Sequence, residues 1–112
     1  MASPLNVFKT VTAEATTIDD TVYTAPNGVT SIILMAQATN ITANTADVTF
    51  SHFNANTSIQ TELVKEYDIP GNDASGLITG KLVIETGDSV KIIASANNAI
   101  KLTLSVLETL NA

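Results

Sequence analysis

The 112-residue sequence contains no cysteine, no arginine and no tryptophan. Without cysteine, the chain cannot form a disulfide, a thiolate nucleophile or a cysteine-ligated zinc site. Its five lysines stand singly and its formal net charge is −6, so it lacks the clustered cations with which proteins bind nucleic acids. The longest unbroken apolar run, residues 32–36, is far shorter than the ~20 residues that span a bilayer. We therefore expect a soluble protein that binds neither nucleic acid nor membrane.

The sequence instead has apolar and polar residues that alternate over short stretches, as in strands with one buried face. Apolar residues occupy every second position in residues 89–96 and again in residues 100–106. Asn97 and Asn98, which tolerate the positive φ of a tight turn, lie between the two stretches. The pattern predicts that these two stretches form a β-hairpin.

Similar stretches, separated by segments rich in turn residues, occur along the rest of the chain. The further expected strands are residues 7–15, 22–24, 29–38, 48–53, 63–69 and 81–85. About eight strands at this spacing predict an all-β antiparallel sandwich, with a jelly roll as one candidate topology. We expect residues 7–112 to form one domain. Residues 1–6 should form an extended N-terminal arm, because Pro4 disfavours helix in the residue before it.

The stretch KLVIETGDSVKIIAS places two carboxylates, Glu85 and Asp88, beside Gly87. Two carboxylates can act as general acid and base when a cleft drives their pKa values apart. A turn needs only glycine for backbone freedom and aspartate for local hydrogen bonds. The turn is the favoured interpretation.

A serine nucleophile is a second candidate for chemistry, because Ser89 follows this turn and His52 is the only imidazole in the chain. Such a nucleophile needs a base within hydrogen-bond reach and a third group that orients the base. His52 falls in an alternating stretch, so a partly buried strand histidine is the favoured interpretation. No catalytic residues are predicted.

Two pairs of neighbouring residues, Asp19-Asp20 and Asn72-Asp73, offer side-chain oxygen atoms to a calcium ion. A calcium site needs roughly six to eight oxygen ligands, and the spacing of a helix-loop-helix calcium loop is missing. Solvated turns are the favoured interpretation. We expect no metal and no other cofactor.

Four residues are candidates for an assembly interface. Pro4 and Leu5 lie in the expected arm, which could reach a neighbouring subunit. Phe53 and Ile93 are apolar residues on the faces opposite the main core stripe. Burial under a loop is the alternative for these last two.

Several turn motifs occur in a fixed order along the chain. They are YTAPNG at residues 23–28, a strand-ending Asn40, IPG at residues 69–71, GKLVIETGD at residues 80–88 and SVLE at residues 105–108. In this order the sequence resembles small virion structural proteins of tailed bacteriophages. The resemblance covers most of the chain from about Thr21 onward. It implies a β-sandwich that decorates or cements the capsid, or that belongs to the neck or tail, with no catalytic residues.

These observations lead to three hypotheses. The first is a non-enzymatic capsid decoration or cement protein on the outer surface of the virion, bound to the major capsid protein and present in symmetric homo-oligomeric copies. The second is a neck, tail or fibre component of the phage particle. The third is a carbohydrate-binding sandwich, which is disfavoured because sugar sites generally use exposed aromatic platforms and the chain has only five aromatic residues.

Overall fold

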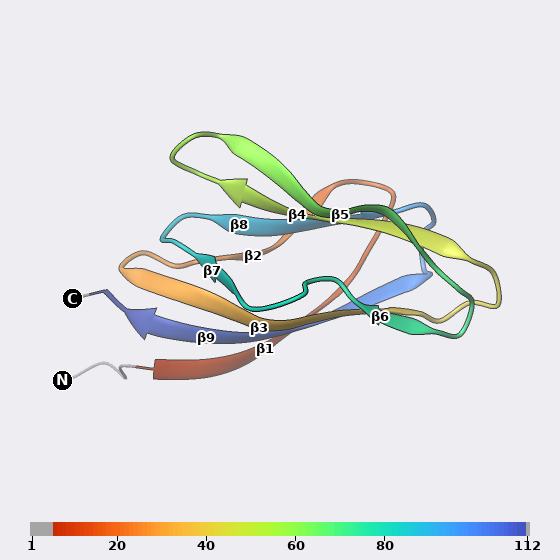
Figure 1. Cartoon of the computed structure of the whole chain (residues 1–112), viewed down its shortest axis with the longest axis horizontal. Coiled ribbons are helices and arrows are strands. Elements are labelled where there is room, and N and C mark those ends of the chain that lie inside the picture. The colour runs from red at the N-terminus through yellow and green to blue at the C-terminus, as the bar shows by residue number, and fades with distance from the viewer. Residues whose placement is uncertain (1–5, 112) are drawn as a thin grey trace.

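The computed structural model describes residues 6–111, which form nine strands and no helix (Figure 1). The strands are β1 (Asn6–Glu14), β2 (Asp20–Thr24), β3 (Val29–Asn40), β4 (Ala46–Asn54), β5 (Ile59–Ile69), β6 (Ala74–Gly76), β7 (Leu82–Ile84), β8 (Ser89–Ala94) and β9 (Ile100–Leu110). Within this range there is no helix that could cross a membrane.

The strands form two antiparallel sheets that face each other as the two layers in Figure 1. Sheet A has the strand order β1-β9-β3-β6, and β7 also pairs with β3. Sheet B has the order β2-β8-β4-β5. The predicted antiparallel β-sandwich is confirmed.

The strand pairs are nested within one another. β1 pairs with β9, β2 with β8, β3 with both β6 and β7, and β4 with β5. A long hairpin with β4 and β5 at its tip, rolled up into two sheets, gives this pattern, which is the jelly roll. The structure therefore has eight strand positions, and β6 and β7 are two short pieces of one of them.

The core lies between the sheets and is formed by the inward-facing residue of each alternating pair. Ile33 and Leu104 contribute from sheet A, and Phe50 and Ile92 contribute from sheet B. All four are fully buried. Burial of each such side chain is worth about 1.5–3 kcal/mol, so this shared core is what holds the two sheets together.

The hairpin predicted for residues 89–96 and 100–106 is wrong. β8 pairs with β2 and β4 in sheet B, whereas β9 pairs with β1 and β3 in sheet A. The intervening turn crosses between the sheets, and Asn98 has the expected positive φ of 60°. Alternation shows that a strand has one buried face. Since both sheets bury a face in the same core, alternation cannot show which strands pair.

The turn within KLVIETGDSVKIIAS likewise crosses between the two sheets. Its first strand, β7, pairs with β3 in sheet A, and its second, β8, belongs to sheet B. The sequence also missed β6, because its three residues, Ala74, Ser75 and Gly76, include no large apolar side chain to mark a buried face. At the other end, β1 includes Asn6, the last residue of the expected arm, which pairs with Thr109.

Candidate functional site

Asp88 closes the turn that the sequence singled out. Its side chain is almost fully buried, and its two carboxylate oxygens accept hydrogen bonds from the backbone N–H groups of Ala55 at 3.0 Å and Glu85 at 3.3 Å. Gly87 adopts a φ of +88°, which few residues other than glycine adopt. Glu85 is exposed and Asp88 is occupied by backbone groups, so the two carboxylates form a turn and not an acid/base pair.

His52 lies in β4 and contacts the same carboxylate. Its Nε2 atom is 3.2 Å from Oδ2 of Asp88, and its side chain is 20% exposed. No hydrogen bond joins His52 to Ser89 among residues 6–111. The structure thus does not bring together the nucleophile and base that the sequence offered.

A second polar cluster links the two sheets, and the sequence analysis did not find it. The Tyr23 hydroxyl, from β2 in sheet B, donates to Oε2 of Glu108 at 2.5 Å and lies 2.7 Å from Oγ of Ser31. Glu108 and Ser31 are buried and belong to sheet A. The ammonium group of Lys9 in β1 lies 3.1 Å from the other oxygen of Glu108. These four side chains form what we call the inter-sheet cluster.

The inter-sheet cluster holds its two acidic groups far from neutral pKa values. Burial and the hydrogen bond to Glu108 raise the pKa of Tyr23 to about 12. Burial alone would raise the pKa of Glu108, but hydrogen bonds from Tyr23 and Lys9 and the Lys9 charge lower it overall. A general acid or base works best with a pKa near the operating pH. Both groups are shifted away from that range, which fits a structural role.

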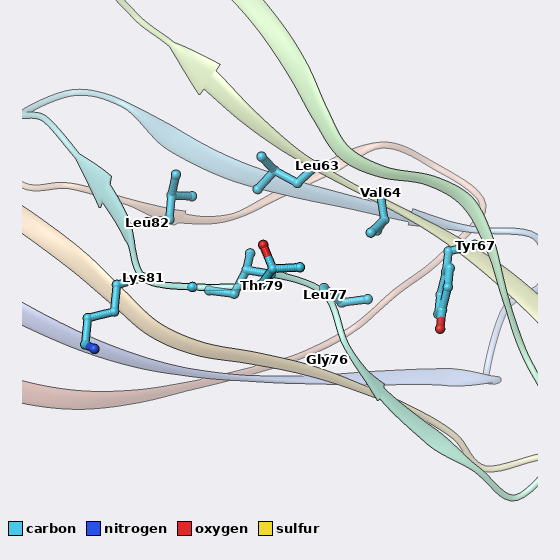
Figure 2. Close-up of a pocket in the computed structure, with 10 residues that line it drawn as sticks. Leu63, Val64, Tyr67, Gly76, Leu77, Thr79, Lys81 and Leu82 are labelled. Atoms are coloured by element: carbon cyan, nitrogen blue, oxygen red, sulfur yellow. The ribbon is translucent and has the colours of Figure 1, made fainter.

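The open flank of the sandwich contains a cleft of about 390 Å³ between β5 and the segment that joins β6 to β7 (Figure 2). It is lined by Leu63, Val64, Tyr67, Gly76, Leu77, Ile78, Thr79, Gly80, Lys81 and Leu82. Its lining contains no carboxylate and no imidazole, so an acid/base pair is not available there. The Tyr67 hydroxyl accepts a hydrogen bond from Ser75 at 3.2 Å, which joins β5 to β6 at the flank.

The candidate calcium ligands do not converge. Among residues 6–111 no group of three or more histidine, cysteine, aspartate or glutamate side chains could hold a metal ion. Asp19 accepts a hydrogen bond from Gln60 at 3.0 Å, and Asp73 caps its own turn through the N–H of Ala74. Asn72 has a positive φ of 60° in that turn.

The motif residues of the phage resemblance have structural roles. Asn40 is fully buried and donates to the carbonyl oxygens of Ile69 at 2.9 Å and Asn44 at 2.7 Å. Its own side-chain oxygen accepts bonds from both the N–H and the hydroxyl of Thr42. At Gly71, a Cβ atom would lie 2.3 Å from a backbone carbonyl oxygen, so only glycine fits. These motifs therefore specify the fold.

The predicted interface residues Phe53 and Ile93 are both half-buried. The ammonium group of Lys91 lies 5.8 Å from the centre of the Phe53 ring, within the range of a cation–π contact. Pro4 and Leu5 lie outside the described residues. All four assignments to an assembly interface stay predictions.

A more exposed apolar surface lies on the outer face of sheet A. Phe8 is directly opposite Leu107, Leu107 is opposite Ile32, and Ile32 is opposite Val83. We call these four residues, from β1, β9, β3 and β7, the apolar row. Phe8 is 74% exposed and Val83 is 56% exposed. The sequence does contain one sign of this exposed apolar surface. The unbroken apolar run of residues 32–36 places apolar side chains on both faces of one strand.

Comparison with known families and characterised proteins finds no match to this chain in sequence. Comparison with solved structures finds a subunit of the disulfide-linked pili of Bacillus endospore appendages, with a TM-score of 0.57, 9% identity, and 96% of this chain and 88% of that chain covered. At this identity the likeness shows the fold alone.

Two virus structures are also similar, with lower scores. For infectious bursal disease virus strain Gx the TM-score is 0.49, with 12% identity and coverage of 99% of this chain and 38% of the other. For a virus-like particle of the extra small virus of the prawn Macrobrachium rosenbergii it is 0.43, with 16% identity and coverage of 96% and 81%.

Proposed function

We propose that this chain is a non-enzymatic capsid decoration or cement protein of a tailed bacteriophage, which binds the shell of the major capsid protein and stabilises it. The order of its turn motifs supports this assignment, because the residues that carry the resemblance also fix the jelly roll. Asn40 and Gly71 each fill a place in the fold that other residues would not fill.

The observation that carries the proposal is the apolar row. An apolar strip on the outside of a sheet costs solubility unless a partner covers it, and such patches commonly mark interaction sites. The row crosses four strands of sheet A and ends at the strongly exposed Phe8 and Val83. We propose that this face lies on the shell. Repeated copies on a lattice would turn weak individual contacts into stable attachment.

The candidate catalytic residues of the sequence and the inter-sheet cluster both support a structural role. Asp88 is used by backbone N–H groups, and His52 contacts it. Tyr23 and Glu108 join the two sheets. Disulfide links of the kind named for the endospore pili are not available to these 112 residues, which contain no cysteine. Assembly through these residues would therefore not use disulfides.

A binding experiment tests the proposal. Purified chain is added to capsid shells that lack it, and bound protein and the temperature of shell disruption are measured. We expect stoichiometric binding and a higher disruption temperature. Val83→Ser should weaken binding about tenfold, since loss of one interface contact of ~1.4 kcal/mol has that effect. Ile18→Ser is the matched control, because Ile18 is 69% exposed but lies outside the apolar row.

No binding to any shell would contradict the decoration role. Binding of only a small closed ring of copies, at one vertex, would instead support the neck or tail alternative. Equal loss of binding with Val83→Ser and Ile18→Ser would show that the apolar row is not the contact.

A further inference from the structure

The outer edge of β1 is an unused pairing surface. β1 is the edge strand of sheet A, and no strand within residues 6–111 pairs with its outer side. Its pairing with β9 runs through nine consecutive residues without a register shift. A long, regular, open edge is a ready template for another strand.

The other sheet edges of the described residues are much less suitable. β2 and β5 each pair with their neighbours through register shifts, and Glu66 of β5 has a positive φ of 47°. β6 and β7 have three residues each. Irregular and very short edges are devices by which proteins block edge-to-edge pairing. β1 carries neither of these devices.

The backbone groups that face the open edge can be identified. The N–H of Ala15 donates to the carbonyl of Ile100, directly after the last β1–β9 pair. Hydrogen-bonded residues alternate along an antiparallel ladder, so the odd-numbered residues of β1 bond to β9. The even-numbered ones direct their N–H and C=O groups outward: Asn6, Phe8, Thr10, Thr12 and Glu14.

We propose that this edge pairs antiparallel with β1 of a second copy of the chain, with Thr10 on the twofold axis. This would join two copies of sheet A into one continuous sheet, an isologous contact of the kind that closed dimers use. The contact does not depend on the virion assignment, so the two proposals can fail separately.

The residues of β1 favour a second copy in this register. With Thr10 opposite Thr10, all nine residues of β1 pair with the second copy. Phe8 then faces Thr12, and Asn6 faces Glu14. The side-chain amide of Asn6 can donate a hydrogen bond to the Glu14 carboxylate. No like charges meet. Threonine pairs and aromatic residues beside β-branched residues stabilise cross-strand contacts. Moving the axis to Lys9 would place Lys9 opposite Lys9, and like charges directly opposite are destabilising. Moving it to Val11 would pair only residues 8–14 of β1.

The second copy would also cover one end of the apolar row. Phe8 is the most exposed large apolar side chain among the described residues, and it stands on this edge. In the proposed register, its ring lies beside the Thr12 methyl group of the second copy. The contact therefore covers the end of the row that the isolated chain leaves in water.

Single-cysteine variants test the register directly, because the natural chain has no other thiol. Opposed Cα atoms in a hydrogen-bonded antiparallel pair lie ~5.5 Å apart, within the range that a disulfide bridges. Thr10→Cys should therefore form a covalent dimer under mild oxidation. Thr12→Cys is the matched control, since both residues are exposed in β1 and share its outer face. Its two Cα atoms would lie roughly 14 Å apart, four residues along the strand, and it should stay monomeric.

A proline variant provides a second, independent measurement. The Thr10 N–H faces the open edge, so Thr10→Pro removes no bond to β9 but blocks the new pairing. We expect sedimentation to show a concentration-dependent dimer for the natural chain and a monomer for Thr10→Pro, with similar circular dichroism spectra. A natural chain that stays monomeric at millimolar concentration, or equal cross-linking of both cysteine variants, would overturn the proposal.

Discussion

Tyr23 donates its hydroxyl proton to a buried carboxylate across the two sheets, and Tyr23→Phe removes this bond with little change in shape. Oε2 of Glu108 then loses its closest partner, and Ser31, which is fully buried, loses the hydroxyl beside it. A hydrogen bond to a charged group contributes ~1.5–3 kcal/mol, so we expect the free energy of unfolding to fall by about 2 kcal/mol at pH 7. For a chain of this length the melting temperature should fall by about 8 °C.

The pH dependence separates this mechanism from a simple packing loss. The pKa of Glu108 is lowered in the folded chain, so the carboxylate contributes stability that is fully present above its unfolded pKa of ~4.3. That contribution is lost as the pH falls through the lower, folded value. The deficit of Tyr23→Phe should therefore be large at pH 7 and should shrink in acid, below the unfolded pKa. Thermal unfolding followed by circular dichroism, at pH 7 and at an acid pH below the unfolded pKa of Glu108, measures this deficit.

The control is Tyr67→Phe, because Tyr67 is exposed and its hydroxyl bonds only at the surface. We expect a change within ~0.5 kcal/mol, as is usual for surface substitutions. The reasoning would be refuted if Tyr23→Phe were as stable as the natural chain, or if its deficit were the same in acid as at pH 7.

Four further predictions follow from the same contacts. The pKa of Tyr23 is raised from 10.0 to about 12, so its contribution to folding stability is complete below pH 10 and is lost as the pH rises toward 12. The Tyr67→Phe variant contains only one tyrosine, Tyr23, and an absorbance titration of it should show ionisation well above pH 10. Gly71→Ala should lower the free energy of unfolding, measured in urea, by ~2–4 kcal/mol, because its Cβ would meet a backbone oxygen. Gly80→Ala should leave that free energy unchanged, because nothing lies within 4 Å of the added Cβ. Equal effects at both glycines would contradict this. Asn40→Ala should cost ~3 kcal/mol in the same assay, since the buried carbonyl of Ile69 and the partly buried bond to the carbonyl of Asn44 lose their amide donor; a loss below ~1 kcal/mol would count against this role. Asp88→Ala should cost a similar ~3 kcal/mol by releasing two backbone N–H groups, and a fully stable variant would show that the turn closes without it.

The sequence allowed most strands to be predicted, because alternation is a local property that a half-buried strand displays by itself. Residues 89–96 and 100–106 were found in this way, and β8 and β9 occupy most of them. Their pairing was wrong, because the two strands share a core without sharing a sheet. A turn between them looks the same in sequence whether it closes a hairpin or crosses the sandwich.

The contacts between distant strands depend on information that no single stretch contains. Tyr23 and Glu108 are 85 positions apart, and their contact follows from the rolled topology. The apolar row takes one residue from each of four strands, and only the registers of β1, β9, β3 and β7 align them. Phe8 looks like an ordinary strand residue in the sequence. Its place at the open edge of sheet A appears only from the strand pairing.

A reconstruction of capsid shells decorated with the purified chain tests the central proposal most directly, because it shows copy number and orientation together. We predict many copies across the outer shell surface, with the outer face of sheet A against the major capsid protein and Val83 in the contact. Shells that remain bare, or bound copies whose apolar row faces solvent, would contradict the account.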